Sequence, residues 1–154
     1  MFLWSVEASA QDMEVGASRY GYNLLWPTKR CCAFDLHLLP NGIGTLAVKR
    51  NDAADPRTES RPLKLTAQDM LSVRRVVEEQ GFFSLPGEIC CGPVDGDMQR
   101  ISVSLGGRTH RVTFGEGAFE KQQGEFVRVM NVWRELKRFS KIDGENVEKS
   151  TNAF

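Results

Sequence analysis

The sequence predicts an α+β fold with the element order ββαββα: a four-stranded, largely antiparallel sheet with two helices packed on one face. Three observations lead to this prediction. Two pairs of segments with alternating apolar and polar residues each enclose a turn, at Pro40-Asn41-Gly42 and at Gly106-Gly107. An amphipathic segment follows each pair. A helix with one apolar stripe must bury that stripe, and one face of the sheet offers the surface.

Length and charge limit the domain organisation and the classes of partner. The chain has 154 residues, which fits one domain. Its 20 basic and 20 acidic residues cancel, so no net charge directs it to nucleic acid or to an anionic membrane. No apolar run approaches the roughly 20 residues of a membrane-spanning helix. We expect an N-terminal arm at residues 1–30, one domain at residues 31–142 and a flexible tail at residues 143–154.

The first ten residues admit two interpretations. Ala8-Ser9-Ala10 resembles a signal-peptidase site, but the segment has no basic start and Glu7 interrupts its short apolar stretch. The segment is either the remnant of a longer export signal, in an exported or periplasmic protein, or an ordinary arm that packs Trp4 on a cytoplasmic domain. Both interpretations stay open at this point.

The first hairpin is predicted on either side of Pro40-Asn41-Gly42. Residues Phe34–Leu38 alternate between apolar and polar, and residues Leu46–Lys49 do so in part. The following stretch, Asn51–Pro62, is polar and rich in charged residues, so we expect a loop there.

The first helix has chemical signals at both ends. Thr66 is a favourable N-cap, and Asp69 stands at the capping-box position three residues later. Leu65 and Met70 can close as a hydrophobic staple, and Gly81 can adopt the left-handed conformation that ends a helix. The apolar stripe comprises Met70, Val73, Val76 and Val77.

The second hairpin spans Ile101–Phe114 and turns at Gly106-Gly107, and the second helix follows it. The apolar stripe of that helix comprises Phe126, Val129, Met130, Trp133 and Leu136. The face of the sheet away from the helices is then expected to carry Asp35, His37, Thr45, Lys49, Ser102, Ser104, Thr109, Arg111 and Thr113.

The two histidines do not form a catalytic set by sequence. His110 alternates with Val112 and Phe114, which favours a core or rim histidine over a catalytic one. His37 shares the polar face with Asp35, but no Ser or Cys is placed as a nucleophile beside them, and no G-x-S-x-G motif occurs. We therefore do not expect an enzyme. A cleft that joins either histidine to a cysteine or a carboxylate would reopen that question.

The cysteines come in two adjacent pairs, Cys31-Cys32 and Cys90-Cys91, each before a predicted hairpin. Three interpretations stand: buried thiols, disulfides in an oxidising compartment, or a zinc site. Adjacent cysteines lack the spacing of usual zinc sites, and Asp95-Gly96-Asp97 lacks the Glu that completes a calcium loop. We expect no metal and no cofactor.

Part of the sequence resembles a known family. Gly81–Pro86, then Asp95-Gly96, then Ile101–Val103 and Gly107–Phe114 form a pattern that resembles emfourin-like bacterial proteins and related small, uncharacterised bacterial families. The stretch runs from the first helix through the second hairpin. Emfourin-like proteins include inhibitors of thermolysin-like metallopeptidases, so the resemblance implies a protein partner of that class.

The leading hypothesis is therefore a small protein-binding module, an inhibitor of thermolysin-like metallopeptidases. The alternative is a non-catalytic structural or envelope-associated accessory domain. An inhibitor presents a rigid segment to its partner, and large aromatic side chains commonly anchor protein interfaces. On these grounds the expected partner-binding residues are Tyr20, Tyr22, Trp26, Asn41, Ile43 and Arg108.

Overall fold

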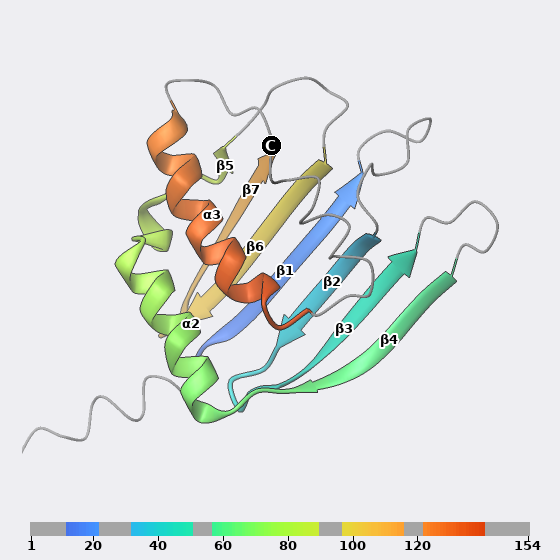
Figure 1. Ribbon diagram of the computed structural model, residues 1–154. Coiled ribbons are helices and arrows are strands. Elements are labelled where there is room, and N and C mark those ends of the chain that lie inside the picture. Colours follow the sequence, from blue (N-terminus) through green and yellow to red (C-terminus); the bar gives the residue numbers. More distant parts are fainter. Residues whose placement is uncertain (1–11, 22–31, 51–56, 90–96, 116–121, 141–154) are drawn as a thin grey trace, which may run out of the picture.

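Seven strands lie side by side in one sheet in the computed structural model, which describes residues 12–21, 32–50, 57–89, 97–115 and 122–140 (Figure 1). The strand order is β4-β3-β2-β1-β6-β7-β5. Neighbouring strands are antiparallel except for the short β5, which runs parallel to β7. The strands are β1 Glu14–Gly21, β2 Cys32–Leu38, β3 Ile43–Arg50, β4 Arg57–Lys64, β5 Glu88–Ile89, β6 Asp97–Leu105 and β7 Arg108–Gly115.

Two helices lie on one face of this sheet, over the side that holds β6 and β7 (Figure 1). They are α2, Ala67–Glu79, and α3, Gln123–Lys137; the short 3-10 helix η1, Phe82–Ser84, follows α2. The α+β class, with both helices on one face of a largely antiparallel sheet, is therefore as predicted.

The predicted start and end of α2 are confirmed. Thr66 Oγ1 accepts a hydrogen bond from the Asp69 backbone N–H at 3.0 Å, and Asp69 Oδ2 accepts from the Thr66 N–H at 3.1 Å. This capping box satisfies backbone donors that the first turn leaves free. Gly81, just beyond the helix, is left-handed with a φ of 60°.

The sheet differs from the prediction in its size, because the described residues form seven strands instead of four. β1 lies at the centre of the sheet, within the segment expected to be an N-terminal arm. β4 occupies much of the expected Asn51–Pro62 loop and extends beyond it. β4 was missed because its sequence, RTESRPLK, has no apolar alternation: it is an edge strand with one neighbour.

Both predicted hairpins are present. β2 and β3 pair directly, with Leu36 opposite Leu46, and β6 and β7 pair with Ile101 opposite Val112. The second hairpin turns through Gly106-Gly107, which have φ angles of 58° and 78°. Positive φ at both central residues is typical of the type I′ turn that suits the twist of two antiparallel strands.

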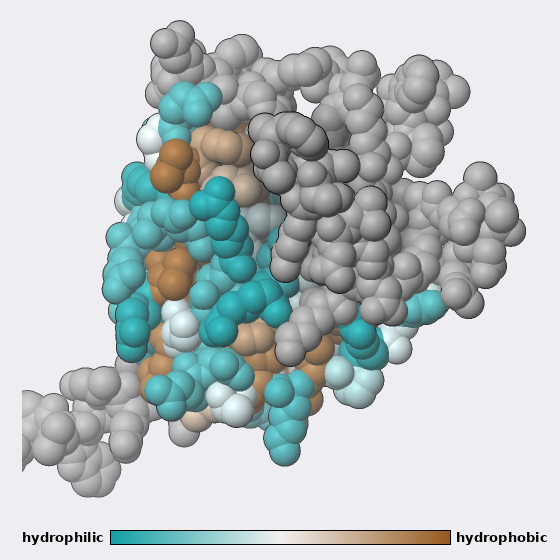
Figure 2. Space-filling model, in the orientation of Figure 1, coloured by the Kyte–Doolittle hydropathy of each residue, from teal (hydrophilic) through white to brown (hydrophobic). Residues whose placement is uncertain are grey.

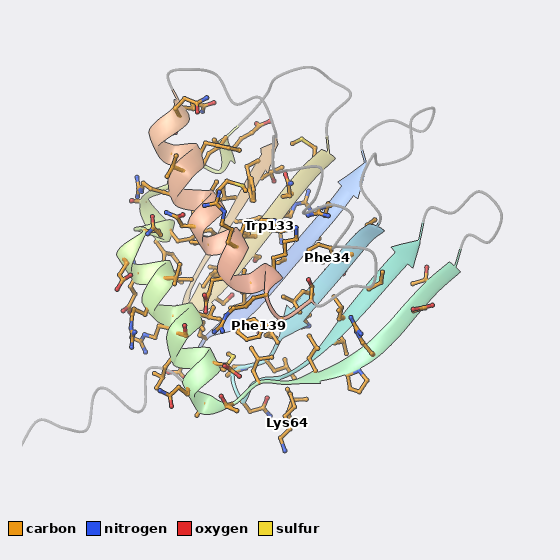
Figure 3. All side chains as sticks on the ribbon, viewed as in Figure 1. Phe34, Lys64, Trp133 and Phe139 are labelled. Atoms are coloured by element: carbon orange, nitrogen blue, oxygen red, sulfur yellow. The ribbon has the colours of Figure 1, made fainter. Side chains whose placement is uncertain are left out.

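The core lies between the helices and the sheet. On the sheet, the buried apolar residues are Val15, Ala17, Phe34, Leu36, Leu38, Leu46, Val48, Ile101, Val103, Val112 and Phe114. Trp133 of α3 stacks on Phe34 of β2 (Figure 3), with ring centroids 5.3 Å apart. Trp133 also meets Phe114 of β7 edge-on, with ring centroids 5.7 Å apart. This indole ties α3 to two strands far apart in the sequence. The predicted helix residues Val73 and Val77 are buried as well.

A buried cation accompanies this aromatic cluster. Arg19 of β1 is 2% exposed, and its guanidinium carbon lies 5.4 Å from the Phe34 ring centroid and 5.8 Å from that of Trp133. These distances are within the range of cation–π attraction. Gln99, directly opposite Arg19 on β6, is also 2% exposed.

The other face of the sheet is polar, as predicted. Its exposed residues include Asp35, His37, Thr45, Thr109 and Arg111, and Ser102, Ser104 and Thr113 are half-buried there. The side chain of Lys49 lies outside the described set.

Candidate partner-binding surface

The turn between β2 and β3 is closed by its own hydrogen bonds. The Leu39 N–H donates to the Ile43 carbonyl, and the Gly42 N–H donates to the Leu39 carbonyl, both at 2.9 Å. The Asn41 side chain accepts from the Ile43 N–H at 3.0 Å. An Asn that bonds the backbone two residues ahead mimics a backbone turn, so the loop is fixed from within.

The same turn is also fixed from outside. The Leu65 N–H donates to the Gly42 carbonyl at 2.9 Å, which joins the turn to the residue before the α2 N-cap. Gly42 has a φ of 83°, and a Cβ built there would come within 2.5 Å of the Leu65 carbonyl oxygen. Only glycine fits this approach without a backbone shift.

Two large apolar side chains project from this turn. Leu39 is 41% exposed and Ile43 is 49% exposed. The other two large hydrophobic residues that are exposed in the described part of the chain are Leu71 on α2 and Val127 on α3. Where Figure 2 colours the surface, the helix side shows hydrophilic residues with separate hydrophobic patches between them. Within the described ranges, the β2–β3 turn is therefore the one short, fixed loop that carries two such side chains.

The β6–β7 turn lies at the same end of the sheet. Val15 of β1 is opposite Leu38 on one side and Val103 on the other, so the strands that lead into the two turns reach the same level. Three strand spacings separate the turn centres, roughly 14 Å. We define the turn surface as residues 39–43 together with residues 106–108.

Arg108 is held at its place on this surface. Its guanidinium carbon lies 4.6 Å from the ring centroid of Phe83 in η1. Next to it, the hydroxyls of Ser104 and Thr109 are 2.8 Å apart and bond across the hairpin. Asn41, Ile43 and Arg108, three of the predicted partner-binding residues, thus lie at one end of the molecule.

The predicted aromatic anchors are placed differently. Tyr20 belongs to β1, with its backbone opposite Met98 at the other end of the sheet. It lies six positions along β1 from Glu14 at the turn end, or roughly 20 Å. Tyr22 and Trp26 lie outside the described residues. Tyr20 is therefore not part of one contiguous patch with Asn41, Ile43 and Arg108.

His37 has a carboxylate partner that the sequence did not indicate. Its Nε2 lies 2.6 Å from Glu14 Oε1, and the two side chains are 51% and 45% exposed. Ser102 shares their face, but Ser102 and His37 both stand opposite Gly16 from neighbouring strands. Two strand spacings, roughly 10 Å, therefore separate their backbones, and the hydrogen-bond partner of His37 Nε2 is Glu14, not Ser102. The two side chains form an exposed hydrogen-bonded pair on the polar face of the sheet.

His110 has the structural role that its alternation predicted. Its Nε2 donates to the Leu85 carbonyl at 2.7 Å, and its ring packs edge-on against Phe82 with centroids 5.6 Å apart. The histidine therefore anchors the segment after η1 to β7.

The side chains of all four cysteines lie outside the described set. Cys32 begins β2 with its backbone opposite Arg50, and its side chain is not described. Cys31, Cys90 and Cys91 lie outside the described residues. Across the five described ranges, no group of three or more His, Cys, Asp or Glu side chains is arranged to hold a metal ion.

Comparison with known proteins adds no family assignment. No protein-family model matches the chain, and no curated protein is significantly similar to it. In the part of the chain that the structure describes, neither helix combines the length and the apolar character needed to cross a membrane.

Proposed function

We propose that this protein is a non-catalytic binding module that inhibits thermolysin-like metallopeptidases through the turn surface. The observation that carries the proposal is the β2–β3 turn, in which hydrogen bonds fix the backbone while Leu39 and Ile43 stay exposed. The resemblance to emfourin-like proteins supports the choice of partner class.

Rigidity is the property that makes the turn suitable. Association must order every mobile group at the interface, and each immobilised side chain reduces affinity. Here the Asn41 side chain and the Leu65 N–H hold the loop before any partner arrives. A peptidase cleft that accepts this loop would therefore gain the contact without first ordering the backbone.

The turn also offers suitable chemistry. Complete burial of a Leu or Ile side chain contributes about 1.5–3 kcal/mol, and Leu39 and Ile43 are each roughly half-buried already. About 1 kcal/mol for each residue remains to be gained on binding. Arg108, fixed over Phe83, is placed at the edge of the same surface, where a partner carboxylate could pair with it.

The test is a titration of the protein into a panel of thermolysin-like peptidases with a peptide substrate. The double variant Leu39→Ser/Ile43→Ser is expected to raise the inhibition constant by roughly thirtyfold, which corresponds to about 2 kcal/mol. The matched control is Leu71→Ser/Val127→Ser, which removes comparably exposed apolar side chains from the helices. The control should inhibit like the unmodified protein.

Two outcomes would count against the proposal. If no peptidase of this class is inhibited at micromolar protein, inhibition is excluded and the accessory-domain alternative takes its place. If both double variants inhibit equally well, inhibition stands but the contact is elsewhere, with Tyr22 and Trp26 the next residues to substitute. Deletion of residues 1–22 is not a suitable test of these aromatic residues, because it would also remove the central strand β1.

A further inference from the structure

Among the described strands, β4 has the longest outer edge that no other strand pairs with. β4 is last in the strand order and has eight residues, whereas the strand at the opposite end, β5, has two. None of the other labelled helices or strands lies along the outer side of β4 (Figure 1). The side chains of residues 58–62 are all exposed. An open edge presents backbone donors and acceptors that can pair with another strand.

The pairing with β3 decides which backbone groups of β4 face outward. The Leu65 N–H donates to the Gly42 carbonyl, so these two residues form a hydrogen-bonded pair. In an antiparallel ladder every second pair is hydrogen-bonded, and the next such pairs are Gly44 with Leu63 and Leu46 with Arg61. The residues between them direct their backbone groups away from β3. The outward-facing residues are Thr58, Ser60, Pro62 and Lys64.

Pro62 fits this assignment. Proline has no N–H to donate, and its position opposite Thr45 is one that needs no bond to β3. An edge proline commonly weakens strand addition because it removes one outward donor. Its carbonyl still faces outward and can accept a hydrogen bond.

From this edge we infer that β4 pairs with β4 of a second copy, antiparallel and centred on Ser60. In this register Ser60 exchanges both backbone hydrogen bonds with Ser60 of the second copy, and the Thr58 N–H donates to the Pro62 carbonyl. The arrangement uses the one outward group that Pro62 retains. The two sheets become one continuous sheet with both helix layers on the same side.

Charge selects this register over its neighbours. With the axis at Ser60, Glu59 faces Arg61 of the second copy, on both sides of the axis. Shifting the axis by one residue places Glu59 against Glu59 or Arg61 against Arg61, and like charges directly opposite each other are destabilising. Both side chains are exposed and thus within reach of a second copy, although Arg61 also donates to the Ser140 carbonyl at 2.6 Å.

The first test measures mass against concentration by light scattering after gel filtration. The average mass of the unmodified protein is expected to rise from 17.3 kDa toward twice that value as the protein concentration increases. Ser60→Pro removes only an outward N–H, as Pro62 already does, so β4 should keep its ladder with β3. This variant should raise the dimer dissociation constant about tenfold. Glu79→Arg, an exposed charge reversal on α2, is the control and should leave it unchanged.

A second test keeps the inference falsifiable if Ser60→Pro does not fold. Glu59→Arg and Arg61→Glu each place like charges opposite each other in the homodimer, so each variant alone should be monomeric. An equimolar mixture restores both opposite-charge pairs and should dimerise. A mass of 17.3 kDa up to the solubility limit, or a mixture that stays monomeric, would overturn the inference. Peptidase inhibition is a separate readout, because Ser60 lies in mid-strand opposite Ala47, away from the turn surface.

Discussion

The Arg128 side chain of α3 donates a hydrogen bond from Nε to the Gln80 backbone carbonyl at 2.7 Å. Gln80 is the C-cap residue of α2, where helix carbonyls lack partners within the helix. The same guanidinium donates from Nη2 to the Gly81 carbonyl and to Ser84 Oγ, both at 2.9 Å. The Arg128 side chain thus caps the C-terminal end of α2 and holds η1 beside it.

Arg128→Met should therefore destabilise the protein. The variant keeps most of the apolar side chain but removes three hydrogen bonds from a charged donor, at a cost of about 1.5–3 kcal/mol. Urea unfolding followed by circular dichroism measures the change. Arg134→Met, on the exposed side of α3, is the control and should stay within about 0.5 kcal/mol of the unmodified protein. Equal stability of the two variants would contradict this role for Arg128.

The burial of the α2 stripe gives a second prediction. Val77 is 0% exposed, so Val77→Asp places an unpaired carboxylate in the core and should cost more than about 3 kcal/mol. Val127→Asp introduces the same group at a position that is 55% exposed, near the start of α3, and should change the free energy of unfolding by less than about 0.5 kcal/mol. Thermal unfolding of both variants decides the matter, and a stable Val77→Asp protein would refute the packing of α2.

Local chemistry explains which parts of this fold are predictable. Thr66, Asp69 and Gly81 determine the ends of α2 through contacts within a few residues, and Gly106-Gly107 determines a turn in the same way. These features need no knowledge of distant partners. The regions they define were predicted correctly.

The missed strands depend on their place in the sheet. Met13, Val15 and Ala17 are buried and alternate with polar or small residues, so the sequence around β1 does contain an alternating pattern. The pattern is short, and the N-terminal segment before it has no such alternation. β4 has no such pattern, because an edge strand with exposed faces has little apolar surface to bury. Pro62 and the high charge are typical of an edge strand but equally of a loop.

In the candidate site, too, local contacts could be predicted from the sequence and contacts between distant strands could not. Asn41 and Gly42 indicated a fixed turn, and their hydrogen bonds are local. Glu14 could not be matched to His37 from the sequence, because their contact depends on β1 and β2 being neighbours across a gap of 23 residues. Arg108 could not be placed at the same end of the sheet as Asn41 from the sequence either, because their placement depends on β1 lying between β2 and β6.

The cysteine pairs lead to a prediction that metal analysis can check. Adjacent cysteines do not provide the usual spacing of zinc ligands, so protein purified without a chelator should contain no stoichiometric zinc. Thiol titration under denaturing conditions, with and without reductant, then separates thiols from disulfides at Cys31, Cys32, Cys90 and Cys91. One equivalent of zinc whose removal unfolds the protein would show the prediction to be wrong.

The last prediction separates the rigidity of the turn from its side chains. Gly42→Ala forces an L-residue to a φ of 83° and brings its Cβ within 2.5 Å of the Leu65 carbonyl oxygen, so the turn must shift away from α2. A left-handed residue alone costs about 1–2 kcal/mol, and the steric clash adds to it. Gly106→Ala has a φ of 58° with no atom near its Cβ, and should cost only about 1–2 kcal/mol.

Binding should respond more sharply than stability to this change. Gly42→Ala keeps Leu39 and Ile43 but moves the backbone that presents them, so inhibition of a susceptible peptidase should weaken at least about tenfold at temperatures where the variant is folded. Circular dichroism on the same samples establishes that they are folded. Gly124→Ala, on α3 outside the turn surface and with no atom within 4 Å of the added Cβ, should inhibit within about twofold of the unmodified protein. If folded Gly42→Ala inhibits at full strength, the fixed shape of this turn is not what the partner recognises.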